Sequence, residues 1–216
     1  MGDFQLAEKK TSIWKVAVLC LVSGFLNSAL SHVISGMWGL PLYLDTLFAA
    51  AVCFSFGLIP GLVTALLHPV FLIIKYIALT DLELAPARLT FLFVFCIFFE
   101  VLLIFSFRNK IKPLDNAFRK QYSLVSFINL APMLLLLAVL DCVVISVSGG
   151  IIDYIITLNS KLQVIHPEDS FKLSLLRNNV PVMASVILSR IPINIVDRFF
   201  VIFGGYGVSL LYRKMV

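Results

Sequence analysis

The chain has 216 residues, of which 60% are hydrophobic and only 13% are charged, with a formal net charge of +5. A soluble domain carries about 25% charged residues, so this composition excludes an ordinary soluble globule and predicts apolar surface in contact with lipid. The positive charge is typical of basic cytoplasmic loops, and nucleic-acid binding is not predicted, because no basic segment accompanies a recognition motif. The length predicts a single membrane domain over residues 1–216.

The first three apolar runs are predicted to form transmembrane helices. The run from about Ile13 to Ile34 is too long for the hydrophobic region of a signal peptide and lacks a small-x-small cleavage site, so a retained helix is expected. The run from about Leu42 to Phe56 is short and ends at the turn Gly57–Gly61. The third run, about Leu62 to Leu79, contains Pro69, which a membrane helix tolerates because neighbouring helices satisfy the freed backbone groups.

Three further runs complete the pattern. They extend from about Ala87 to Phe107, from about Phe127 to Val147, and from Pro181 to Tyr212, where Pro192 is expected to divide an outer segment from the span itself. The connection over residues 149–180 is long enough to fold over the bundle as a lid. The sequence therefore predicts an all-α, polytopic membrane protein with a six-helix transmembrane bundle.

The distribution of lysine and arginine predicts the orientation of these helices. Basic residues are concentrated in the loops that stay in the cytoplasm. If both termini and the loop 108–122 are cytoplasmic, ten of the 17 basic residues lie inside, namely Lys9, Lys10, Lys15, Arg108, Lys110, Lys112, Arg119, Lys120, Arg213 and Lys214. The segment 149–180 is then extracytoplasmic, and the protein is expected in the plasma or inner membrane.

Signatures of catalysis and of metal binding are missing from the sequence. There is no GxSxG, HExxH, Walker or GxGxxG motif, and the three histidines are widely separated. The four cysteines lie in separate apolar runs without a CxxC pair, which favours a packing role over a zinc or redox site. No enzymatic activity, cofactor or metal site is predicted.

Ionisable residues within the apolar runs are the candidates for function, because a charge inside a membrane is costly and usually has a role. The predicted substrate-binding residues are Asp45, Lys75, Asp141, Arg190, Asn194 and Arg198. Four predicted helices contribute charge near the outer side, which favours a polar pocket that is open to the outside. The alternative is that Lys75–Asp141 and Arg198–Asp45 are structural ion pairs that hold the helices together.

Arg198 is the strongest single candidate, because its planar guanidinium offers a fork of hydrogen-bond donors. Asn194 lies one turn earlier on the same helical face. The adjacent Asp197 is assigned to helix packing, because neighbours on a helix point about 100° apart. Glu100 is expected to lie deeper than the others, without an evident partner.

Small residues line one face of the first predicted helix. They are Ala17, Cys20, Gly24 and Ser28. Such a face allows helices to approach closely. It serves helix packing within the chain or the coupling of another membrane subunit.

This face, the run Phe54–Ala65, the closing run Ile191–Phe199 and the overall layout resemble the substrate-binding S components of energy-coupling-factor (ECF) transporters, a type of ABC transporter. The resemblance implies a six-helix membrane subunit that captures a vitamin or related micronutrient from outside for uptake, without catalysis of its own. It also implies a transmembrane coupling subunit, which would contact the small-residue face, and ATPase subunits on other chains.

Two other functions compete with this one. A membrane-embedded sensing or signalling module would bind a ligand without transport, but such modules usually carry a cytoplasmic output domain, and few residues follow Tyr212. An intramembrane enzyme would need paired catalytic groups, and Glu100 has no evident partner. The mixture of acidic and basic groups suits a polar or zwitterionic heterocycle as the ligand, without identifying it.

Overall fold

The structure is a computed structural model that describes residues 12–79, 91–121, 124–159 and 167–215. All regular structure in these ranges is helical, which confirms the predicted all-α class for the described part of the chain. The elements in chain order are α1 (Ile13–Ser31), the π-helical segment η1 (His32–Met37), α2 (Leu47–Phe56), α3 (Leu58–Leu79), the 3₁₀ segment η2 (Phe91–Phe93), α5 (Val94–Gln121), α6 (Leu124–Asn159), α7 (Pro167–Arg177) and α8 (Val182–Met215).

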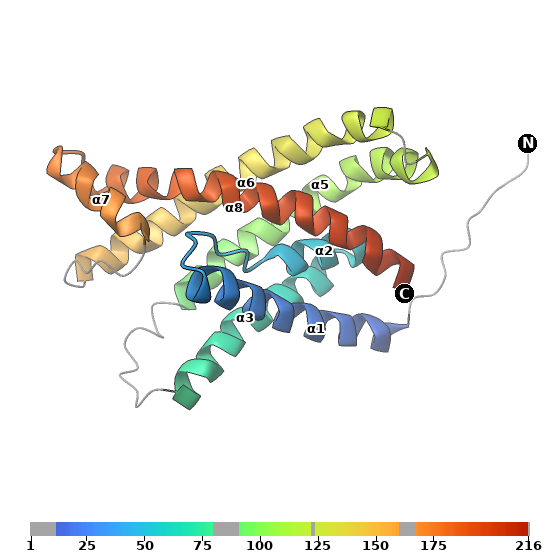
Figure 1. The fold of residues 1–216 in the computed structure, drawn as a ribbon, viewed down its shortest axis with the longest axis horizontal. Helices are drawn as coiled ribbons and strands as arrows, with labels where there is room; N and C mark the ends of the chain where they lie inside the picture. The colour runs from blue at the N-terminus through green and yellow to red at the C-terminus, as the bar shows by residue number, and fades with distance from the viewer. Residues whose placement is uncertain (1–11, 80–90, 122–123, 160–166, 216) are drawn as a thin grey trace, which may run out of the picture.

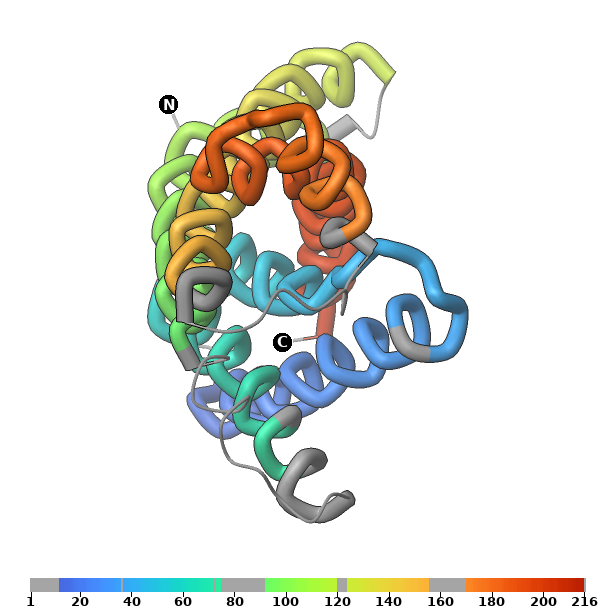
Figure 2. Tube along the Cα trace, turned by 90° about the vertical axis from the view of Figure 1, so that its left-hand side faces the viewer, coloured from blue at the N-terminus to red at the C-terminus, as the bar shows by residue number. Residues whose placement is uncertain are grey.

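The long helices run along the longest axis of the molecule (Figure 1). Helices α5, α6 and α8 pack together, α1 packs on α3, and the short helix α2 contacts both groups. Figure 2 looks along the bundle from the α7 end and shows α2 between these groups, with α7 lying across the end of α6 and α8. The start of α1, the junction of α5 with α6 and the end of α8 lie at the opposite end of the molecule (Figure 1).

Several predicted boundaries are wrong, because helix continues where loops or breaks were expected. The segment 108–121, predicted as a cytoplasmic loop, is the last part of α5. Burial along this segment repeats with the period of a helix. Ile111 and Asp115 are buried one turn apart, while Lys110 and Lys112 are exposed. Pro113 lies on the exposed side of this stretch and does not end the helix.

The predicted loop over 149–180 is largely helical in the described ranges. Helix α6 continues to Asn159 and α7 covers Pro167–Arg177, while residues 160–166 lie outside the described residues. Helix α6 continues through Gly149 and Gly150, because α8 packs closely against them. A Cβ added at Gly150 would lie 2.6 Å from Cγ1 of Ile187 on α8. The two glycines therefore permit close packing of α6 on α8 and do not form a turn.

The other proline and glycine positions also differ from expectation. Helix α8 is continuous through Pro192, which was expected to divide it. The expected turn Gly57–Gly61 is a single residue in the structure. Gly57 lies between α2 and α3 and has a φ of 101°. This is a conformation that glycine adopts without strain.

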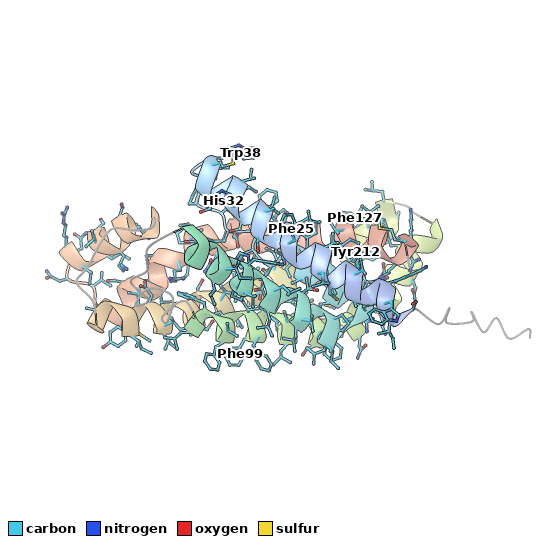
Figure 3. The ribbon with its side chains drawn as sticks, turned by 90° about the horizontal axis from the view of Figure 1, so that it is seen from below. Phe25, His32, Trp38, Phe99, Phe127 and Tyr212 are labelled. Carbon is cyan, nitrogen blue, oxygen red and sulfur yellow. The ribbon has the colours of Figure 1, made fainter. Side chains whose placement is uncertain are left out.

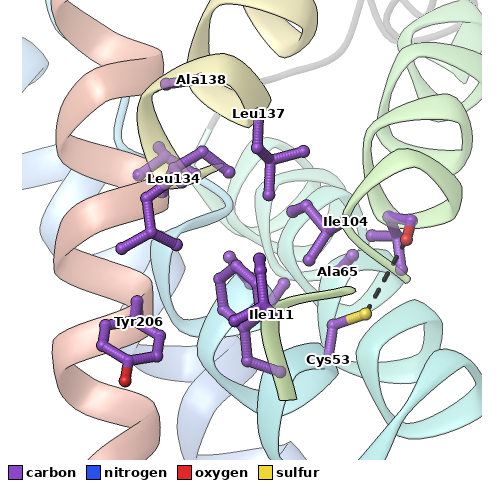
Figure 4. Close-up of a cluster of buried hydrophobic side chains, with 14 of the residues drawn as sticks. Cys53, Ala65, Ile104, Ile111, Leu134, Leu137, Ala138 and Tyr206 are labelled. Atoms are coloured by element: carbon purple, nitrogen blue, oxygen red, sulfur yellow. Dashed lines mark hydrogen bonds between the residues drawn. The ribbon is translucent and has the colours of Figure 1, made fainter. Parts of the chain in front are cut away.

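The apolar core lies between α5, α6 and α8 and extends to α2. In Figure 4, Leu134 and Leu137 of α6 lie with Ile104 of α5 and Tyr206 of α8 in one cluster of buried side chains. The close approach of α2 to α8 depends on Gly205, where a Cβ would lie 2.9 Å from the Cβ of Ala50. Burial of each large aliphatic side chain contributes about 1.5–3 kcal/mol.

The outer surface of the bundle carries many large apolar side chains. Trp14 on α1 is 81% exposed, and Phe25 on the same helix is 60% exposed. Figure 3 shows Trp38 and Phe99 projecting from opposite sides of the bundle. Among the described residues, two stretches are long and apolar enough to cross a membrane, Ile13–Ser35 and Leu124–Ile155.

Candidate functional site: a buried ionic cluster around Arg198

Arg198 lies halfway along α8 and is only 4% exposed. Its Nη1 donates a hydrogen bond of 2.6 Å to Oε1 of Glu100 and one of 3.1 Å to Oγ1 of Thr46. Its Nε and Nη2 both donate to Oδ2 of Asp197. Nη2 lies 3.5 Å from Oδ1 of Asp45, and Nη1 lies 4.0 Å from Oδ2 of Asp141. We call these six residues the Arg198 cluster.

Asp197 positions part of the cluster through the backbone that precedes α2. Its Oδ1 accepts hydrogen bonds from the backbone N–H of Tyr43, at 2.8 Å, and of Leu44, at 3.0 Å. Leu44 has a φ of 44°, in the left-handed region that non-glycine residues seldom adopt. The bend that Asp197 holds places Asp45 and Thr46 directly beside Arg198.

The other carboxylates come from the middle of two long helices. Thr46 donates a 2.6 Å hydrogen bond to Oε1 of Glu100, which lies on α5 and is 1% exposed. Asp141 lies halfway along α6 and is fully buried. Among the described residues, neither of its oxygens has a hydrogen-bond partner, and its one ion pair is the 4.0 Å approach to Arg198. Burial of a polar atom without a partner is costly, so this carboxylate is an unusual feature.

Asp45 connects the cluster to the surface. Its side chain is 27% exposed, whereas the other three carboxylates of the cluster are at most 2% exposed. Its Oδ2 lies 3.9 Å from Nε2 of His68, whose Nδ1 is 3.1 Å from Oγ of Ser28. The remaining members are closed off by their own contacts, so the cluster is a packed ionic core that reaches solvent at Asp45.

A second group of charges links α7 to the bundle. Nζ of Lys172 on α7 lies 3.3 Å from Oδ2 of Asp153 on α6, and Nη2 of Arg190 on α8 lies 3.9 Å from the same oxygen. The guanidinium of Arg190 also lies over the ring of Phe93, 5.5 Å from its centroid. These contacts hold α7 against the end of α6 and α8.

A third group closes the end of α2, and we call it the α2 cap. Arg108 donates to the carbonyl oxygens of Phe54 and Ser55, and Arg213 also donates to that of Phe54. The Tyr206 hydroxyl donates a 2.6 Å hydrogen bond to Oδ1 of Asp115, and Arg213 pairs with Oδ2 of that carboxylate. The arginines thus bind the last carbonyl groups of α2, which lack partners within the helix.

The residues predicted to bind a substrate do not form one site. Asp45, Asp141 and Arg198 meet in the Arg198 cluster, where the Asp45–Arg198 pair is present. Arg190 belongs to the separate group at α7. Asn194 lies one turn from Arg198, and its Nδ2 donates a 2.9 Å hydrogen bond to Oγ of Ser146. The side chain of Lys75 lies outside the described residues, and with it the Lys75–Asp141 pair.

Sequence reasoning missed three members of the cluster. Asp197 was assigned to helix packing, but its carboxylate pairs with Arg198. Glu100 was expected to have no evident partner, which is wrong, because it pairs with Arg198 and accepts from Thr46. The signal was present, since Glu100 is a lone carboxylate in an apolar run and needs a buried partner. No local signal marks Thr46, whose role depends on the bend at Leu44.

The small-residue face of α1 lies mostly against α3. Cys20 approaches the backbone oxygen of Pro60, and Ser28 contacts His68. A Cβ on Gly24 would lie 2.6 Å from the Cβ of Leu67. These contacts are helix packing within the chain, and Ala17 is the one member of the face that is exposed.

The Arg198 cluster joins four carboxylates, one guanidinium and a hydroxyl from three helices and the segment before α2. Such an arrangement can bind a small polar molecule through charge-assisted hydrogen bonds. In the described ranges, no group of three or more His, Cys, Asp or Glu residues is arranged to hold a metal ion. Comparisons of the chain with protein-family models, with curated proteins and with solved structures found no match.

Proposed function

We propose that the chain is a multi-pass helical membrane protein that captures a small polar ligand, as the S components of ECF transporters do. The observation that carries this proposal is the distribution of polarity. Charged side chains of the Arg198 cluster are buried at the centre of the bundle, while large apolar side chains such as Trp14 and Phe25 face outward. A soluble protein has the opposite arrangement, whereas a membrane bundle turns its ionisable residues inward.

The course of the chain supports a six-span topology with both termini in the cytoplasm. Helices α1, α2, α3, α5, α6 and α8 follow one another along the bundle, and the start of α1, the α5–α6 junction and the end of α8 share one end (Figure 1). The basic residues Arg108, Lys110, Lys112 and Arg213 belong to that end. Basic residues of this kind favour the cytoplasmic side.

The lengths of α6 and α8 support a capture role for the opposite end. At 1.5 Å per residue, the 36 residues of α6 extend about 54 Å, well beyond a hydrocarbon core of about 30 Å. Helix α7 lies across the extended ends of α6 and α8 and is tied to them by Lys172. In the proposed function, α7 takes the place of the expected loop as the cover over an outward-facing entrance.

Transport by this chain requires energy from other chains, because its sequence carries no Walker motif. The proposed partners are a transmembrane coupling subunit and ATPase subunits. Because Cys20, Gly24 and Ser28 pack within the chain, the coupling subunit would contact other surfaces, including the exposed face of α1 that carries Trp14 and Phe25.

The test is purification of the tagged full chain from native membranes in mild detergent. Mass spectrometry then identifies the small molecules and the proteins that accompany it. We expect one small polar molecule together with coupling and ATPase subunits. The variant Asp45→Asn is expected to lose the molecule and keep the subunits, because Asp45 is the partly exposed member of the cluster. Recovery of neither ligand nor transport subunits would contradict the proposal.

A further inference from the structure

The Arg198 cluster contains more carboxyl groups than cationic groups among the described residues. Four carboxylates surround one guanidinium, and the one further cationic candidate among the described side chains in contact is His68, 3.9 Å from Asp45. Four carboxyl groups therefore share one guanidinium. Because buried carboxyl groups need a donor or a counter-charge, four of them around one guanidinium indicate a cationic partner other than the described side chains.

Asp141 indicates independently where such a group binds. Its side chain is fully buried, and neither oxygen accepts a hydrogen bond from a described residue. Asp115 is buried to nearly the same degree, yet both of its oxygens are bonded, one to Tyr206 and the other to Arg213. Buried carboxylate oxygens are normally hydrogen-bonded. Asp141 therefore presents two acceptor atoms to the cluster without a donor to match them.

We propose that the Arg198 cluster binds a singly charged cationic group at Asp141, so that the ligand captured in the proposed function, on which this inference rests, is positively charged. A protonated amine or an amidinium fits this chemistry, because its N–H groups would donate to both oxygens of Asp141 and its charge would pair with the carboxylate. An alkali-metal ion would supply the same charge. Asp45 is where exchange with solvent begins, since it is the partly exposed carboxylate.

The experiment measures the melting temperature of the purified full chain in detergent at constant ionic strength. The probes are acetamidine hydrochloride and its neutral isostere acetamide, with methylammonium, sodium and potassium chlorides as further arms. We expect acetamidinium to raise the melting temperature of the wild type and acetamide to leave it unchanged. Asp141→Asn should weaken the apparent affinity for acetamidinium at least about tenfold, the effect of losing a charge-assisted hydrogen bond. Asp115→Asn is the matched control and should keep the wild-type affinity.

Comparison of the probes distinguishes an organic cation from an inorganic one. A shift with sodium or potassium alone, lost in Asp141→Asn, would support an inorganic cation. The proposal is overturned if no cation acts more strongly than acetamide, or if Asp141→Asn keeps the full shift. These probes require neither transport nor partner subunits, so this failure is distinct from failure of the co-purification experiment.

A measurement on the wild type alone covers the case in which Asp141→Asn does not fold. The acetamidinium shift should grow from about pH 4 to about pH 8, because a cation binds the ionised form of the carboxyl groups. A shift that does not change over this range overturns the proposal. The described ionisable groups that interact with Asp141 are Glu100, Arg198, Asp197, Asp45 and Cys142.

Discussion

Asp115 and Asp141 are both almost completely buried, but they belong to regions with different charge balance. Asp115, in the α2 cap, has a partner for each oxygen and an arginine beside it. Asp141, in the Arg198 cluster, shares one distant arginine with three other carboxylates. The α2 cap is complete in its own contacts, which is the character of a structural element. In the Arg198 cluster the two oxygens of Asp141 have no donor among the described residues, which agrees with the binding site proposed above.

The largest effect is expected from removal of Arg198. Arg198→Ala would leave four carboxylates with no guanidinium, and the expected loss is about 3–5 kcal/mol of the free energy of unfolding. Thermal melting in detergent measures it. Arg198→Lys keeps the charge without the fork of donors, so its melting temperature should lie between those of Arg198→Ala and the wild type. A well-folded Arg198→Ala protein with the melting temperature of the wild type would show that the carboxylates are already neutral.

A matched pair of aspartate substitutions tests the comparison directly. Asp115→Ala leaves the Tyr206 hydroxyl and Arg213 without their acceptor and should cost about 1–3 kcal/mol of stability. Asp141→Ala removes no hydrogen bond to a described residue and removes a buried carboxyl group, so it should cost less than Asp115→Ala. Thermal melting of both variants under one condition measures the difference. The reverse order would mean that Asp141, and not Asp115, is the structural carboxylate.

A smaller effect is expected when one hydrogen bond of the α2 cap is lost. Tyr206→Phe removes the donor to Oδ1 of Asp115 and keeps the ring in the core, so the expected cost is about 0.5–1.5 kcal/mol. The control is Tyr212→Phe, which loses a buried hydrogen bond to Ser23 outside both regions. Affinity for acetamidinium should stay unchanged in both variants, and a change in Tyr206→Phe would connect the α2 cap with the Arg198 cluster.

The smallest effect on stability is expected from single cysteines that are introduced to determine which end of the bundle faces the cytoplasm. Single cysteines at Asn116, beside the α2 cap, and at Arg177, in the last turn of α7, replace exposed residues. An impermeant thiol reagent added to intact cells should label position 177 and spare position 116 until the membrane is opened. The native cysteines Cys20, Cys53, Cys96 and Cys142 are buried, so their background should be low. Labelling of position 116 in intact cells would contradict the proposed topology.

The sequence indicated part of the Arg198 cluster because the cost of a buried charge can be recognised locally. Asp45, Asp141 and Arg198 each interrupt an apolar run, and such residues need partners wherever the chain folds. The identity of the partners depends on contacts between distant segments. Glu100 is 98 positions from Arg198, and Asp197 binds the backbone of Tyr43, 154 positions away. No periodicity within one helix encodes such a pairing.

The sequence by itself determined that the described chain is helical, since long apolar runs with few breaks satisfy their backbone hydrogen bonds most simply as helices. Only the tertiary structure decided where those helices end. Pro192 remains inside α8, and Gly150 remains inside α6 because a neighbouring helix packs closely against it. The tertiary structure also decided that Asp115 has partners for both oxygens and Asp141 for neither. The physical reason is that a charge is costly in any fold, while its counter-charge is set by which helices pack together.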